Sequence, residues 1–125
     1  MMIYSVLPYL YYVACAGAIG FQFALIFGAP WGRITQGGRH AGALPVSGRI
    51  AAGVSVFILL AMVFSIISAA GWWPHWPVWA SWLALAVQAL STLANWITPS
   101  RAERILWGPI TLVMLLVAGS IVFAA

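Results

Sequence analysis

The chain has 125 residues, of which 65% are hydrophobic and only 5% are charged. Soluble domains are roughly 45–50% apolar and about 25% charged, so this chain cannot cover a water-soluble core with a polar surface. The composition excludes a soluble domain and predicts one integral membrane domain over residues 1–125. In such a domain, the positive-inside rule accounts for the net charge of +4.

Four segments are long and apolar enough to cross a bilayer, which takes about 20 mostly apolar residues. They cover residues 3–27, 49–71, 77–97 and 101–124. The first is not a signal peptide, because it lacks a basic start and its apolar run is too long. The connections are inner loops at 28–48 and 98–100 and an outer turn at 71–77. Short connections join antiparallel neighbours, so we expect an all-α, antiparallel four-helix bundle.

The arginines predict the orientation of the bundle. All five lie at the first and third connections: Arg33, Arg39, Arg49, Arg101 and Arg104. Arginine-rich short loops stay in the cytoplasm, so both termini and the 71–77 turn are expected outside. Aromatic residues are expected at both membrane interfaces. The outer belt would hold Tyr4, Tyr9, Tyr11, Tyr12, Trp72, Trp73, Trp76 and Trp79, and the inner belt Trp31, Trp96 and Trp107.

Glu103 is the only acidic residue, which raises the possibility of a proton-coupling role. Ser100 lies three residues before it, in the S-x-x-E pattern of a helix capping box. In such a box each side chain accepts a hydrogen bond from the other residue's backbone amide. We favour this structural role for Ser100 and Glu103, since coupling acids normally lie deeper in the membrane. It predicts that Glu103→Gln retains function.

Polar and small residues follow one face of the third predicted helix at spacings of three and four, and we call them the polar seam: Ser81, Ala84, Gln88, Ser91 and Asn95. The first helix adds Gln22 and a small-residue face of Ala16, Gly20 and Ala24. Two interpretations remain open. These groups hold helices together, or Gln22, Gln88, Ser91 and Asn95 line a cavity for a neutral or amphipathic ligand. No carboxylate is expected there, which disfavours a proton-driven cation exporter.

The five arginines also form a candidate site for an anionic head group, set against a simpler role in topology and attraction to anionic lipid. Nucleotide binding is not expected, because no phosphate-loop lysine motif is present. His40 and His75 lie on opposite predicted sides and Cys15 is the only cysteine, so no metal site, haem or other cofactor is expected. No nucleophile–base–acid set is visible, and we expect no enzymatic activity.

Two segments, "FGAPWGRITQGGRHAGALP" and "TPSRAERILWGP", resemble a group of small bacterial four-helix membrane proteins of unknown activity. That group pairs a W-G-x-x-T-x-G-G inner loop with a later T-P-S-x-x-E-R-x-x-W-G-P segment. The resemblance implies that the two inner segments lie together, in one structure containing Trp31, Arg33, Arg101, Glu103 and Trp107. The chain also resembles small multidrug transporters in length, but its first helix has no embedded glutamate.

The sequence therefore favours a non-enzymatic, multi-pass protein of the bacterial cytoplasmic (inner) membrane. It would bind or pass a small amphipathic or lipid-like ligand. The alternative is an accessory or structural subunit of a larger membrane complex. The expected partners are membrane lipid and either a homo-oligomer or such a complex, with no nucleic acid.

Overall fold

The structure, a computed structural model, describes residues 2–125 and their side chains from Ser5 onward. Four helices account for most of the chain: α1 (Met2–Ile26), α2 (Val46–Ala69), α3 (Val78–Ile97) and α4 (Arg101–Ala124). Two short 3₁₀ turns, η1 (Gly32–Ile34) and η2 (Gln36–Gly38), lie between α1 and α2. The start of α2 lies three residues before the predicted one, because the less apolar turn after Pro45 is already helical.

The first two helices end in the same way, at a glycine with positive φ. At Gly28 the backbone has φ +97°, and at Gly71 it has φ +90°. The amide of Gly71 bonds the Ser68 carbonyl, and the next amide, of Trp72, bonds the Ile67 carbonyl. This pair of bonds closes the helix end and turns the chain back. The third helix ends just before Pro99, which cannot continue it.

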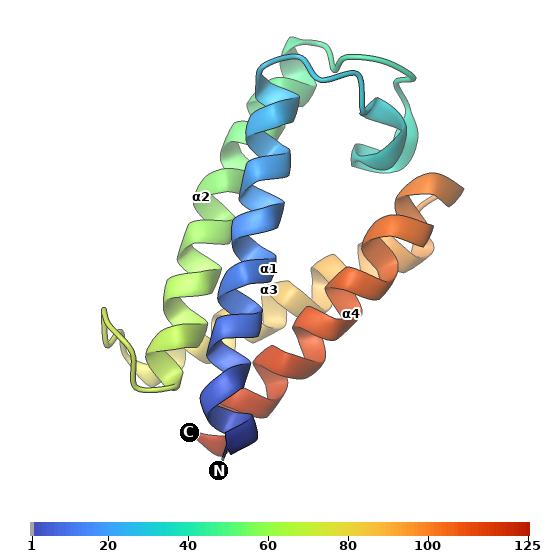
Figure 1. Ribbon diagram of the computed structural model, residues 1–125. Coiled ribbons are helices and arrows are strands. Elements are labelled where there is room, and N and C mark those ends of the chain that lie inside the picture. Colours follow the sequence, from blue (N-terminus) through green and yellow to red (C-terminus); the bar gives the residue numbers. More distant parts are fainter. Residues whose placement is uncertain (1) are drawn as a thin grey trace.

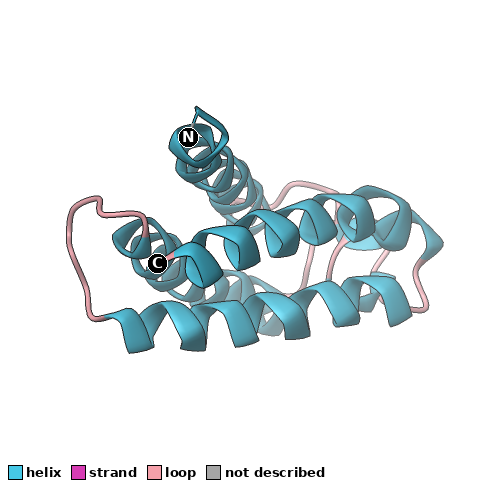
Figure 2. Cartoon of the chain, turned by 90° about the horizontal axis from the view of Figure 1, so that it is seen from below, coloured by secondary structure: helices cyan, strands magenta, loops and turns pink. Residues whose placement is uncertain are grey.

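The helices form two antiparallel hairpins, α1 with α2 and α3 with α4 (Figure 1). Both termini and the 70–77 turn lie at one end of the molecule, which we call the terminal end. The α1–α2 loop (residues 29–45) and residues 98–100 lie at the other, which we call the arginine end. The hairpins converge at the terminal end and diverge toward the arginine end, and the view from below shows them crossing (Figure 2).

The main core lies where the hairpins converge. It draws on all four helices: Leu7, Tyr11, Cys15, Met62, Val63, Ile66, Ile67, Ala84, Met114, Val117, Ala118, Ile121 and Val122. A smaller cluster of Leu25, Leu44 and Ala52 joins α1, α2 and their loop at the arginine end. Neither cluster fills the space between the two hairpins at the arginine end.

The outer surface of the bundle is apolar. Phe27, Phe57 and Phe123 expose 83%, 75% and 74% of their surfaces. All four helices are long and apolar enough to span a bilayer. Water would be a poor solvent for this surface and lipid a good one. The chain is a multi-pass membrane protein with four antiparallel helices, as the sequence predicts.

The prediction for one aromatic residue is wrong, and the rest of the two aromatic belts stays a prediction. Tyr11, expected in the outer belt, is fully buried in the core. Helix rotation turns it inward, whereas Tyr9 lies outside and packs edge-on against Trp72, with ring centroids 4.6 Å apart. The side chain of Tyr4 lies outside the described residues. At the arginine end, Phe21 stacks on Trp31.

Candidate functional site

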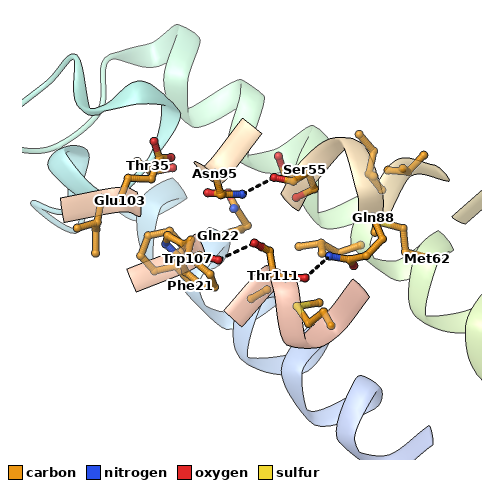
Figure 3. Close-up of a pocket in the computed structure, with 17 residues that line it drawn as sticks. Phe21, Gln22, Thr35, Ser55, Met62, Gln88, Asn95, Glu103, Trp107 and Thr111 are labelled. Atoms are coloured by element: carbon orange, nitrogen blue, oxygen red, sulfur yellow. Dashed lines mark hydrogen bonds between the residues drawn. The ribbon is translucent and has the colours of Figure 1, made fainter. Parts of the chain in front are cut away.

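A cavity of about 230 Å³ lies between the diverging hairpins at the arginine end. All four helices and the α1–α2 loop line it (Figure 3). Its polar lining consists of Gln22, Thr35, Ser55, Gln88, Ser91, Asn95, Glu103 and Thr111. Apolar side chains, including Met62, Met114, Phe21 and Trp107, complete the wall. From Glu103 to Met114, the lining of α4 extends about 16 Å at 1.5 Å per residue, so the cavity reaches from the arginine end toward mid-membrane.

The four residues that the sequence nominates for a ligand cavity, Gln22, Gln88, Ser91 and Asn95, all line this one. The polar seam of α3 faces the interior along its length: Ser81, Ala84 and Gln88 are buried, and Ser91 and Asn95 are half-buried. The structure therefore brings together residues from α1 and α3 that lie up to 73 positions apart in the sequence (22 to 95).

Gln88 is occupied by bonds to other helices. Its Oε1 accepts a hydrogen bond from the Tyr11 hydroxyl at 2.9 Å. Its Nε2 donates to the Thr111 carbonyl at 3.3 Å, and the Thr92 hydroxyl donates to the same carbonyl at 3.0 Å. Gln88 is only 1% exposed. Gln88 therefore joins α1 and α4 to α3 at the deep end of the cavity. For this residue, the interpretation that the polar seam holds helices together applies.

Three other polar side chains of the cavity lack a hydrogen-bond partner in the described chain. Asn95 donates its Nδ2 to the Ser91 carbonyl at 2.8 Å, within its own helix. Among the described residues, no hydrogen bond is found for the side-chain amide of Gln22 or for the hydroxyls of Ser91 and Thr35. In the same part of the chain, every fully enclosed side-chain nitrogen or oxygen has a partner. These three groups therefore keep accessible surface, which in the cavity can meet a ligand or water.

Glu103 lies at the arginine end of the cavity, 8% exposed, with Thr35 drawn beside it in Figure 3. Its amide donates to Ser100 Oγ at 3.2 Å, which confirms Ser100 as the helix cap. The reciprocal arm of the predicted capping box does not form. The Ser100 amide donates to Thr98 Oγ1 at 3.3 Å instead.

The carboxylate of Glu103 has different partners. Its Oε1 accepts from the Thr98 hydroxyl at 2.5 Å and from the Gly37 amide at 3.2 Å. The local pattern suggested a bond to Ser100, but the side chain turns inward because the α1–α2 loop supplies a donor there. The expectation that no carboxylate lies in the cavity is therefore wrong. Glu103, Trp107 and Thr111 are spaced four residues apart and so share one face of α4. This spacing is the sequence signal that could have placed Glu103 in the cavity.

The α1–α2 loop is fastened to the start of α4. The Ser100 hydroxyl donates to the Arg33 carbonyl at 2.5 Å. Gly38, with φ +69°, approaches so closely that a Cβ there would lie 2.6 Å from the Cβ of Ser100. This confirms that the two inner segments lie together. Phe21 links them further, since its ring contacts both Trp31 and Trp107.

The candidate head-group arginines do not share one environment. Arg33 and Arg101 are exposed, and Arg104 is half-buried. Arg49 donates its Nε to the Leu44 carbonyl at 3.1 Å and so stabilises the start of α2. A shallow polar hollow at the arginine end is lined by Arg39, alone among the five, together with Gln36, His40, Ser47 and Gly48. An anionic head-group site remains a prediction.

The chain matches no family model, no curated protein and no solved structure. Its four long apolar helices fit a small four-helix membrane protein, which is the coarse part of the resemblance drawn from the two inner segments. Because no family is identified, functional inference rests on the cavity and its lining.

Proposed function

We propose that the protein binds a small amphipathic ligand in the cavity between the two hairpins, as a non-enzymatic component of the bacterial cytoplasmic membrane. The observation that carries this proposal is the set of unpartnered polar groups on Gln22, Thr35 and Ser91, facing a cavity whose remaining wall is largely apolar. Binding sites for small molecules combine a mainly apolar wall with a few such polar groups.

A route from the bilayer supports a ligand with an apolar part. A groove of about 530 Å³ lies between α2 and α3 on the apolar surface of the bundle. Ile58, Met62 and Val87 line both this groove and the cavity. An apolar chain could therefore lie in the groove while the polar end of the same molecule occupies the cavity. In this arrangement the protein could take its ligand from the membrane and pass it toward the arginine end.

Ligand retention by the purified protein tests the proposal. The native protein in an uncharged detergent is expected to keep a small amphipathic molecule that native mass spectrometry detects. The double variant Gln22→Leu/Ser91→Ala should lose it, because both side chains line the cavity and neither has a partner within the described chain. Ser120→Ala is the matched control, since Ser120 is exposed on α4 and its hydroxyl donates to the Leu116 carbonyl of the same helix. Equal retention by all three proteins would overturn the proposal, as would no binding from a panel of small amphiphiles.

A second candidate function, an accessory subunit of a larger membrane complex, is favoured by one face of α1. Of the small-residue face predicted for close helix approach, Ala16 and Gly20 are exposed and Ala24 is half-buried, and a Cβ added at Gly20 would meet nothing within 4 Å. At Ala16 and Gly20, no helix of the described chain covers this face. If another helix covers it, Gly20→Leu should release a protein that the native chain captures in stoichiometric amount. The cavity variants should leave that capture unchanged.

A further inference from the structure

The charge in the cavity comes from Glu103, the one ionisable carboxylate or guanidinium group in its described lining. One oxygen of its carboxylate is held by Thr98 and Gly37. No partner is found in the described chain for the other oxygen, and no fully enclosed side-chain oxygen there is unpartnered. That oxygen therefore retains accessible surface on a residue that lines the cavity and is 8% exposed. A carboxylate with so little water around it attracts a cation more strongly than an exposed one does.

Two aromatic rings line the cavity with this carboxylate. Phe21 projects from α1 and Trp107 from α4, one helical turn beyond Glu103, and their ring centroids lie 4.9 Å apart. The face of an aromatic ring attracts a cation, and tryptophan does so best. An ammonium group with methyl or alkyl substituents gains from the rings and the carboxylate together, whereas an anion would be repelled by Glu103.

No arginine side chain in the described lining opposes the preference of the cavity for a cation. None of the five is in the described lining. Arg101 lies two residues before Glu103, on nearly the opposite side of α4 at 100° per residue, and is exposed. Exposed charges are screened by solvent and salt. Of the other four arginines, two are exposed and two are half-buried, all outside the described lining. The cavity lining itself thus carries the negative charge, and the positive charge lies outside it.

We propose that the cavity selects a small organic cation, an alkylated ammonium group that Glu103 pairs and that the rings of Phe21 and Trp107 contact. This deepens the proposed function and rests on it. Gln22, Ser91 and Asn95 supply hydrogen bonds to polar substituents of the same molecule. The volume of about 230 Å³ is smaller than the roughly 300–1,000 Å³ of sites for drug-sized ligands. The cation, or the head group of a longer molecule, is therefore small.

Choline and its neutral isostere 3,3-dimethylbutan-1-ol separate charge from shape. Equilibrium binding of radiolabelled choline to the purified protein, with the isostere as competitor, gives both affinities. The native protein is expected to bind choline roughly tenfold or more tightly than the isostere, as for a poorly hydrated charge pair. Glu103→Gln should remove this difference while leaving the affinity for the isostere unchanged. Glutamine can still accept the bonds from Thr98 and Gly37, so the loop contact is retained.

Two further variants complete the experiment. Arg101→Gln changes an exposed charge at the same end of α4 and should alter choline affinity little. Phe21→Leu keeps an apolar wall but removes one ring, and should lower the preference for choline over the isostere. If Glu103→Gln does not fold, the preference of the native protein for choline and its decrease in Phe21→Leu still decide whether the cavity selects a cation.

The outcomes distinguish this inference from the proposed function. Equal affinity for choline and the isostere in the native protein, or an unchanged preference in Glu103→Gln, would overturn the cation inference. Binding of neutral amphiphiles that depends on Gln22 and Ser91 would then leave the proposed function standing. If neither the two probes nor the amphiphile panel binds, both proposals fail.

Discussion

The hydroxyl of Tyr11 in α1 donates a hydrogen bond to Oε1 of Gln88 in α3, 2.9 Å away and 77 residues along the chain. Both side chains are almost fully buried, at 0% and 1% exposure. Gln88 also reaches α4 through the Thr111 carbonyl. This one contact therefore joins the two hairpins at the deep end of the cavity, where they begin to diverge.

Replacing Tyr11 by phenylalanine should lower the free energy of unfolding by about 0.6–2 kcal/mol, the range measured for hydrogen bonds between membrane helices. The ring still fills the core, but Gln88 Oε1 loses its donor. Thermal unfolding in detergent measures the effect. Tyr12→Phe is the control, because Tyr12 is the next residue and half of its surface is exposed. Equal stability of the two variants would show that the contact contributes nothing.

Gln88→Leu and Gln22→Leu should have different consequences, although both remove a glutamine from the cavity. Gln88→Leu removes bonds to Tyr11 and to the Thr111 carbonyl and should cost about 1–3 kcal/mol of stability. Gln22→Leu should leave stability nearly unchanged, because its amide has no partner in the described chain. The sequence alone made Gln88 a candidate ligand-contacting residue. If Gln88→Leu unfolds like the native protein but no longer binds ligand, the role assigned here to Gln88 is wrong.

The sequence predicts the helices and the polar seam well, because both depend on local properties. Apolar length determines which segments span, and spacings of three and four place Gln88 and Asn95 on one side of α3 whatever surrounds it. The four-helix, antiparallel arrangement follows from the short connections. The positions of Gln22, Ser91 and Asn95 around one cavity were therefore foreseeable as an alternative to simple helix packing.

Glu103 and Tyr11 were misplaced because their surroundings depend on tertiary contacts. The S-x-x-E pattern gives Glu103 a local partner, but the α1–α2 loop offers the Gly37 amide, and Thr98 offers a hydroxyl. The local sequence pattern contains no information about a donor from a distant segment, so it cannot predict that Glu103 bonds these donors and not the Ser100 amide. Tyr11 lies within the first half of α1 (Met2–Ile26), where a tyrosine suits either an interface or a core. Only the rotation of α1 against α3 decides between them.

Ser100→Ala should lower stability by about 0.5–2 kcal/mol, the usual cost of losing an N-cap. The hydroxyl accepts from the Glu103 amide and donates to the Arg33 carbonyl, so its loss weakens both α4 and the fastening of the loop. The unfolding temperatures of Ser100→Ala and Ser120→Ala compare a cap with an exposed serine of the same helix. Equal unfolding temperatures of the two variants would show that other contacts hold the start of α4.

The close approach of Gly38 to Ser100 gives the sharpest test of how the α1–α2 loop docks. An alanine at position 38 would place its Cβ 2.6 Å from the Cβ of Ser100 and 3.0 Å from the Arg33 carbonyl, at a φ of +69° that alanine rarely adopts. The loop must then move, and we expect a loss of about 1–3 kcal/mol with faster hydrogen exchange over residues 29–45. Gly42→Ala is the matched control in the same loop, because a Cβ there meets nothing within 4 Å. Since Gly37 and the carboxylate of Glu103 lie beside this contact, Gly38→Ala should also disturb the cavity at its arginine end. Identical exchange and stability in the two alanine variants would mean that the loop does not rest on α4 in the membrane.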